Sequence, residues 1–124
     1  GFKKLLIYQR AKLLVLYIYL LTKKFPKGEI YILIPQIRRA VISIMANIGE
    51  GYTKNSTKEY LRYINIATGS LIELEIYADL AIELKYIIPE EYQKLINDIE
   101  EMKRLLYSTR FALERRAKTK RQEG

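Results

Sequence analysis

The chain lacks the two side chains that most often build catalytic and metal sites. It has 124 residues and contains no cysteine and no histidine. Without cysteine there is no disulfide framework and no thiolate metal site. Without histidine the commonest general base and the commonest metal ligand in proteins are both missing. We therefore expect a protein that is not an enzyme and that uses no metal or other cofactor.

Long hydrophobic runs are also lacking. The apolar run from Leu13 to Leu21 has nine residues, whereas a helix needs roughly 20 to span a bilayer. No small-residue cleavage site follows this run, as a secretory signal would require. We expect a cytoplasmic protein with no membrane partner.

The chain does contain an excess of positive charge, which is unevenly distributed. The formal net charge is +8. Residues 1–62 hold 12 Lys and Arg against 3 acids, residues 63–114 hold 5 against 10, and residues 115–124 hold 5 against 1. Such a division favours a directed electrostatic surface over a uniform coat. The partner could be a polyanion or the acidic face of another copy.

Apolar residues recur at steps of three and four in four segments, which is the spacing of one helix face. The pattern predicts helices at about residues 3–24, 35–51, 57–85 and 89–116. Pro35, Ser56 with Glu59, and Pro89 suit helix starts, and Gly51 suits a left-handed helix end. Residues 29–34 could form a short strand, but no second strand candidate exists, so a loop or helical lead-in is favoured. We predict an all-α, antiparallel up-down-up-down four-helix bundle over residues 1–116 and a mobile basic tail over residues 117–124.

The first predicted helix is apolar almost all round. Its seam for the bundle core consists of Tyr8, Ala11, Val15, Ile18, Thr22 and Phe25. The opposite side should be polar, but large apolar side chains stand there too, and monomers avoid exposed patches of that kind. We expect this side to be buried against another copy of the chain. The alternative is an apolar surface that stays exposed to solvent. The predicted oligomer interface consists of Leu13, Leu16, Tyr17 and Leu20.

The second predicted helix carries a stripe of short polar side chains beside its apolar one. Gly69 stands inside the third helix, where close backbone packing should offset its cost of about 1 kcal/mol. A hydrogen-bonded network between the second and third helices is the favoured interpretation. A di-metal site is the alternative, but bundles build such sites with a Glu-x-x-His motif that this chain cannot form. The predicted network consists of Asn47, Glu50, Ser70 and Glu73.

Two blocks of sequence carry a resemblance to a known family. The first runs from Gln36 to Gly51 and contains Gln-Ile-Arg-Arg-Ala, Ser-Ile, Ala-Asn-Ile and Glu-Gly. The second runs from Lys58 to Glu75 and contains Lys-Glu-Tyr and Gly-Ser-Leu-x-Glu-Leu-Glu. Together they resemble the small four-helix-bundle proteins first named for intervening sequences in 23S rRNA genes. The family also includes accessory variability determinant proteins of diversity-generating retroelements.

The resemblance implies a bundle that assembles as a ring, commonly a homopentamer. It also implies, for the retroelement branch, binding to nucleic acid and to a reverse transcriptase. This chain departs from the family pattern at the start of the second helix, where Ile34 and Pro35 replace a Thr/Ser pair, so the side-chain cap is lost. Lys85 stands where the family has a glycine before Tyr86.

Basic residues are the candidate contacts to RNA or DNA, through phosphates and without sequence preference. Lys58 and Arg62 share a helix face, whereas the arginine pair in the second helix lies turns away and could instead lock neighbouring subunits. For Lys54, Lys58 and Arg62 the alternative is an ordinary solvated surface. For the tail the alternative is a solubilising role. Base stacking on Tyr52 or Tyr63 is a further alternative, but core or interface packing is favoured for the tyrosines. The candidate residues are Arg38, Arg39, Lys54, Lys58, Arg62, Arg115, Arg116, Lys118, Lys120 and Arg121.

The sequence thus favours a basic, ring-forming nucleic-acid-binding protein, as a partner of a retroelement reverse transcriptase. One alternative is an rRNA intervening-sequence protein without a defined biochemical role. Another is a protein–protein scaffold whose charge asymmetry serves self-assembly.

Overall fold

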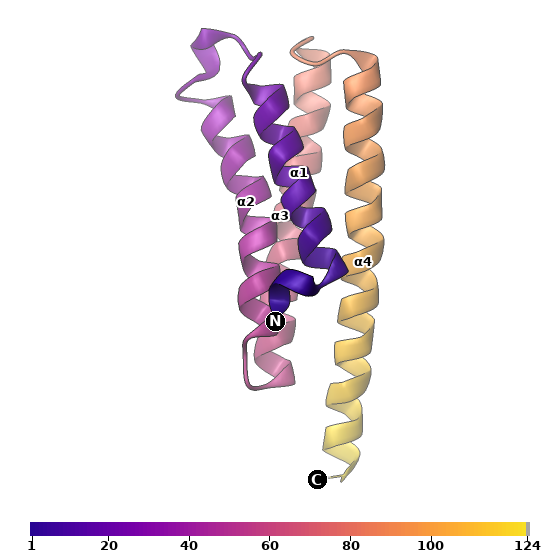
Figure 1. Cartoon of the computed structure of the whole chain (residues 1–124). Helices are drawn as coiled ribbons and strands as arrows, with labels where there is room; N and C mark the ends of the chain where they lie inside the picture. Colours follow the sequence, from indigo (N-terminus) through magenta and orange to yellow (C-terminus); the bar gives the residue numbers. More distant parts are fainter. Residues whose placement is uncertain (124) are drawn as a thin grey trace.

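The computed structural model describes residues 1–123 as an all-α four-helix bundle (Figure 1). The fold class predicted from the helical spacing is therefore confirmed. Neighbouring helices run antiparallel, so the chain goes up, down, up and down. In chain order the elements are η1 (Phe2–Lys4), α1 (Leu6–Thr22), η2 (Lys27–Glu29), α2 (Leu33–Tyr52), α3 (Thr57–Glu83) and α4 (Pro89–Glu123).

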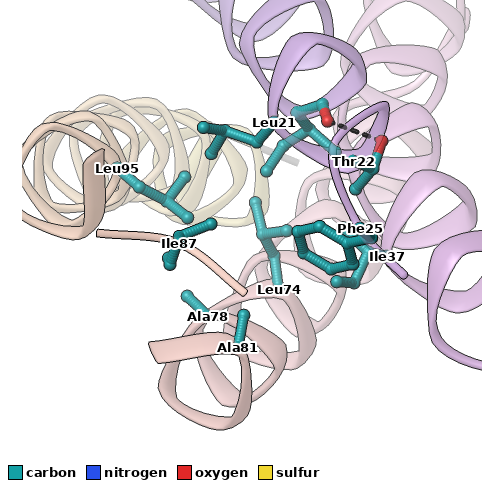
Figure 2. Close-up of a pocket in the computed structure, with 10 residues that line it drawn as sticks. Leu21, Thr22, Phe25, Ile37, Leu74, Ala78, Ala81, Ile87 and Leu95 are labelled. Carbon is teal, nitrogen blue, oxygen red and sulfur yellow. Dashed lines mark hydrogen bonds between the residues drawn. The ribbon is translucent and has the colours of Figure 1, made fainter. Parts of the chain in front are cut away.

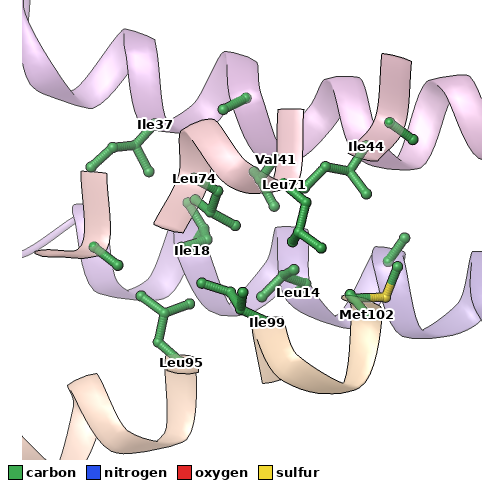
Figure 3. Packing of buried hydrophobic residues seen from close by; sticks show 14 of the residues in the cluster. Leu14, Ile18, Ile37, Val41, Ile44, Leu71, Leu74, Leu95, Ile99 and Met102 are labelled. Atoms are coloured by element: carbon green, nitrogen blue, oxygen red, sulfur yellow. The ribbon is translucent and has the colours of Figure 1, made fainter. Parts of the chain in front are cut away.

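The four helices surround one apolar core. Contact is most extensive between α2 and α3, followed by α3 with α4 and α1 with α2, while α1 and α4 touch more sparsely. Figure 3 shows side chains from all four helices meeting in the centre, among them Leu14, Val41, Leu71 and Ile99. Burying one such side chain stabilises the fold by about 1.5–3 kcal/mol relative to exposure. The core therefore makes the main contribution to the stability of the bundle.

The seam predicted for α1 is correct in most positions and shifted in one. Ala11, Ile18 and Thr22 are buried as expected, but Val15 is only half-buried and Leu14 takes the central place. An extended Leu5 separates η1 from α1, so α1 begins later than predicted, at Leu6.

Helix starts follow the predicted chemistry. The Ser56 hydroxyl accepts a hydrogen bond from the backbone N–H of Glu59 at 3.1 Å. At the start of α4, the Glu91 carboxylate accepts one from the backbone N–H of Ile88 at 3.0 Å. The residue before α2 is Ile32, which gives no side-chain cap, in agreement with the predicted loss. Residues 27–29 form a 3-10 turn, and the described residues contain no strand.

Two helix ends differ from the prediction. Gly51 does not end α2 in a left-handed conformation, because it is helical and the helix closes at Tyr52 with Thr53 after it. The left-handed residue is instead Lys85, with φ of 62°, at the end of α3.

The fourth helix continues past Arg116 to Glu123. Residues 117–123 of the predicted tail are thus helical, and Gly124 lies outside the described residues. Good helix formers fill this stretch and no proline or glycine interrupts it. In Figure 1 this end of α4 projects beyond the other helices. None of the helices described is both long and apolar enough to cross a bilayer.

Candidate nucleic-acid interface

The bundle end that holds the α2–α3 turn carries a basic groove. It has a volume of about 590 Å³ and lies between the first turn of α3 and the last turns of α4. The sequence predicted two separate basic groups here, one around Lys58 and one in the tail. Because α4 stays helical to Glu123, it carries the second group to the first. The groove is lined by Ser56, Thr57, Lys58, Leu61, Ala117, Lys120 and Arg121.

The groove's electrostatics favour an anion. Among the described residues, no ion pair joins Lys58, Lys120 or Arg121 to an acidic side chain. The N-terminal turn of α3 adds partial positive charge from its free N–H groups. Lys58 is part of that turn, so charge and dipole act in the same place.

Close packing of α2 on α3 holds this end together. A Cβ placed on Gly51 would lie 2.8 Å from Cβ of Tyr63 and 3.1 Å from Cδ1 of Tyr60. The rings of Tyr52 and Tyr60 meet edge to face with centroids 6.2 Å apart. Burial raises the pKa of the Tyr60 hydroxyl, the neighbouring Tyr52 raises it further, and the charge of Arg116 lowers it. Arg116 therefore belongs to the same end of the bundle.

Two of the candidate cations lie close to the ring of Tyr63. Nζ of Lys54 lies 5.1 Å and Cζ of Arg62 lies 4.7 Å from the centroid of this ring. Nε of Arg62 also donates to the Glu59 carboxylate at 2.9 Å, and this hydrogen bond lowers the pKa of Glu59. Because Arg62 is already paired, Lys54 and Lys58 offer more free charge to a ligand.

The arginine pair in α2 occupies a different part of the molecule. Nε of Arg38 donates to Oγ1 of Thr22 at 2.9 Å, and its Cζ lies 4.3 Å from the centroid of the Tyr19 ring. Arg38 thus joins α2 to α1 within one chain, a role the sequence did not suggest. Arg39 is exposed.

A second basic groove surrounds Arg38 at the opposite end of the bundle. Its volume is about 480 Å³, and Lys23 and Lys27 line it together with apolar side chains. These two lysines were not among the candidates predicted from the sequence. Their position on either side of the Phe25-Pro26 turn was the available signal, since a tight turn brings flanking residues together.

The residues predicted for an oligomer interface separate into two kinds. Leu13, Leu16 and Leu20 are 56%, 58% and 58% exposed. Tyr17 instead packs within the chain: its hydroxyl donates to the carbonyl oxygen of Glu91 at 3.2 Å, and Nζ of Lys94 lies 4.4 Å from its ring centroid.

The predicted polar network is smaller than expected. The hydroxyls of Ser43 and Ser70 lie 2.8 Å apart, and Nδ2 of Asn47 donates to the Ser43 carbonyl at 2.8 Å. Glu50 and Glu73 are exposed and stay outside this network. Glu73 accepts a hydrogen bond from the Tyr77 hydroxyl instead, at 3.2 Å. The two carboxylates therefore do not form a pair suited to acid–base chemistry.

The close packing predicted at Gly69 is also missing within the chain. A Cβ on Gly69 would have no atom within 4 Å. Gly69 faces outward because it lies opposite the buried stripe of α3 that contains Leu71 and Leu74. The close approach of α2 and α3 occurs at Gly51 instead.

The cavity in Figure 2 is part of the core. It is lined by apolar residues such as Leu74 and Ile87, with Thr22 at its edge. Its volume is about 10 Å³, around the minimum for a single water molecule. It has no room for a substrate.

Comparison with known proteins places this bundle in a family. The family described as 23S rRNA-intervening sequence protein matches residues 3–108. The chain belongs to this family. No curated protein matches it. A crystal structure of a protein with unknown function from the S23 ribosomal protein family of Bacteroides thetaiotaomicron is similar, with a TM-score of 0.79 and 28% identity over 85% of this chain and 98% of that one.

The family match covers all four helices but stops before the last turns of α4. The matching family carries the rRNA intervening-sequence description, and neither of these matches points to the retroelement subtype. Of the basic groove, Lys58 lies inside the matched residues, whereas Lys120 and Arg121 lie beyond them.

Proposed function

We propose that this protein binds RNA or DNA at the groove between the start of α3 and the end of α4. The supporting observation is the meeting of Lys58, Lys120 and Arg121 at one helix N-terminus, without acidic partners among the described residues. Lysine and arginine in such a place contact phosphates and release counterions. The role is one of binding and holding, with no covalent step.

The family match favours the rRNA intervening-sequence branch over the retroelement branch. The partnership with a reverse transcriptase therefore stays a prediction from resemblance. Phosphate binding at the groove serves either branch, because it does not depend on base sequence. A gene neighbourhood containing an rRNA gene or a reverse transcriptase would separate the two.

The test is nucleic-acid binding measured by fluorescence anisotropy across a salt series. The double variant Lys58→Glu/Lys120→Glu should bind weakly. For a single strand, the slope of log affinity against log salt should become shallower by about 1.4, because each phosphate that is no longer neutralised removes about 0.7. The control Lys23→Glu/Lys27→Glu makes the same change in net charge at the opposite end of the bundle.

The control variant should retain most of the affinity. Equal losses of affinity in both double variants would mean that total charge, and not the groove, governs binding. Absence of binding by the unchanged protein at low salt would refute the proposal and favour the scaffold alternative.

Self-assembly is a second part of the proposal. Exposed aliphatic rows run along the outer faces of α1, with Leu13 and Leu16, and of α3, with Ile72 and Ile76. Monomers rarely leave such rows uncovered. The change Leu13→Glu/Leu16→Glu should lower the mass measured by light scattering, whereas Tyr31→Ala in the α1–α2 loop should not. A monomeric unchanged protein would contradict assembly; ring closure and five-fold symmetry rest on the family resemblance alone.

A further inference from the structure

The outer face of α4 carries a pair of exposed aromatic side chains. Tyr107 and Phe111 are 61% and 51% exposed. One helical turn separates them, and their rings are nearly parallel, with an angle of 14° and centroids 6.4 Å apart. Aromatic rings contribute large apolar areas to an interface when a ligand covers them. This pair therefore offers an exposed aromatic surface on the outside of the bundle.

Cations flank the two rings. Cζ of Arg110 lies 5.8 Å from the Tyr107 centroid, and Cζ of Arg115 lies 5.9 Å from the Phe111 centroid. Arg104 and Lys118 are exposed and extend the same side of the helix at steps of three and four. Two acids lie along this side: an oxygen of Glu114 lies 3.7 Å from Nε of Arg110, and Glu100, one turn before Arg104, pairs with Lys103. Positive charge prevails along this stripe.

Other exposed apolar faces of the bundle have a different chemistry. The outer faces of α1 and α3 present leucine and isoleucine, which suit contact with a similar protein surface. Aromatic rings interleaved with arginine instead suit a ligand that has both flat π-faces and negative charge. Unpaired nucleotide bases with their phosphates have both properties.

We propose that the stripe Arg104, Tyr107, Phe111, Arg115 and Lys118 is a stacking surface for single-stranded nucleic acid. Unstacked bases lie on the rings of Tyr107 and Phe111, and the arginines contact the phosphates between them. The stripe continues toward the basic groove, because Lys118 is one helical turn before the groove residue Arg121. This inference rests on the proposed function and narrows its ligand from nucleic acid in general to the single-stranded form.

The test compares single-stranded oligonucleotides with duplexes of the same length. The variant Tyr107→Ala/Phe111→Ala removes the rings without changing charge, and both positions are exposed, so the bundle should stay folded. Affinity for the single strand should fall by roughly 5-fold or more for each ring removed. Affinity for the duplex should not change, because its bases already stack on one another.

Two control variants separate stacking from charge. Tyr31→Ala removes a tyrosine that is 92% exposed in the α1–α2 loop, and it should leave binding unchanged. Arg115→Ala should make the salt slope shallower by about 0.7, whereas the double aromatic variant should leave the slope as it is.

A direct signal comes from Phe111→Trp. The chain contains no tryptophan, so a single indole would report from α4 alone. Its emission should be quenched by a single strand and not by a duplex.

Three results would overturn the inference. If the double aromatic variant binds both forms as before, the rings take no part, although groove binding would stand. If it weakens both forms equally, unpaired bases are not what the stripe recognises. If it lowers the mass of an assembly seen by light scattering, the stripe is an interface between copies. Failure of the proposed function looks different, because the unchanged protein would then bind no nucleic acid at all.

Discussion

Two glycines inside helices give opposite expectations for the same substitution. Gly69, in the interior of α3, gains about 1 kcal/mol of helix propensity when changed to alanine, and Gly51, in the last turn of α2, gains at most as much. At Gly69 the new methyl group would have no atom within 4 Å. Gly69→Ala should therefore stabilise the protein by about 1 kcal/mol, or by about 3–5 °C in melting temperature for a chain of this size.

At Gly51 the new methyl group would lie 2.8 Å from Cβ of Tyr63. That atom is fixed to the α3 backbone and cannot rotate away, so α2 and α3 must separate. Overpacking of this kind costs about 1–3 kcal/mol, which offsets or exceeds the gain in propensity. Because Gly51 lies in the last turn of α2, its propensity gain is at most that of Gly69. Gly51→Ala should therefore be less stable than Gly69→Ala by at least the cost of the clash, about 1–3 kcal/mol.

The assay is urea unfolding followed by circular dichroism, repeated at several protein concentrations. A Gly51→Ala variant as stable as Gly69→Ala would refute the close packing of α2 on α3. A Gly69→Ala variant that loses stability, and more so at low protein concentration, would refute the expectation of open space there and would place a second copy against Gly69.

Three further changes test local features of the bundle. Lys85→Gly should raise stability by about 1 kcal/mol, because Lys85 has φ of 62° and glycine adopts that conformation without the steric cost of a side chain; unchanged thermal unfolding would contradict this. Glu91→Gln should lose about 1 kcal/mol at pH 7, because Glu91 sits in the first turn of α4 and interacts with Lys24. The hydrogen bond from Lys24 lowers the pKa of Glu91 below its ordinary value of 4.5, so its contribution is fully present above pH 4.5 and disappears as the pH falls through the lower folded-state pKa. Stability curves of the two proteins should converge in acid, and a constant gap would contradict the assignment. Ser70→Ala should cost up to about 1 kcal/mol by removing one of the two side-chain partners of the Ser43 hydroxyl, the other being Asn47. A double-mutant cycle with Ser43→Ala should show coupling; strict additivity would argue against the hydrogen bond.

Sequence spacing predicts the helices well and their outer contacts poorly. The steps of three and four that mark Ile64, Leu71 and Leu74 follow from burial on one side of a helix. This constraint leaves a pattern that can be read from a single sequence. The close packing predicted at Gly69 occurs at Gly51 instead. Both glycines stand in helical sequence, and spacing does not tell which one faces a neighbouring helix. Only the relative rotation of α2 and α3 decides this.

Prediction of the groove from the sequence is limited in a similar way. Lys58 and the tail cations are each recognisable from sequence as candidate phosphate contacts, but their meeting depends on how far α4 extends. The stretch after Arg116 has no apolar side chains large enough to signal a helix by periodicity, so spacing alone predicts a tail. Its helix formers are the available signal. The internal contact made by Arg38 is not predictable in this way, because its partners, Thr22 and Tyr19, belong to another helix.

The distribution of ion pairs bears on the scaffold alternative. If the acidic part of the chain served to attract the basic part of another copy, its carboxylates should be free. Several are instead paired within the chain: Glu91 with Lys24, Glu101 with Arg10, and Glu75 with Lys103. Exposed pairs of this kind add little stability, but they cancel charge on the flank of the bundle. Lys58, Lys120 and Arg121 show no such pairing in the described part of the chain. Within residues 1–123, unpaired positive charge therefore remains at the groove, as it does at Lys23 and Lys27 at the opposite end of the bundle. This pattern favours a polyanionic ligand over electrostatic attraction between copies.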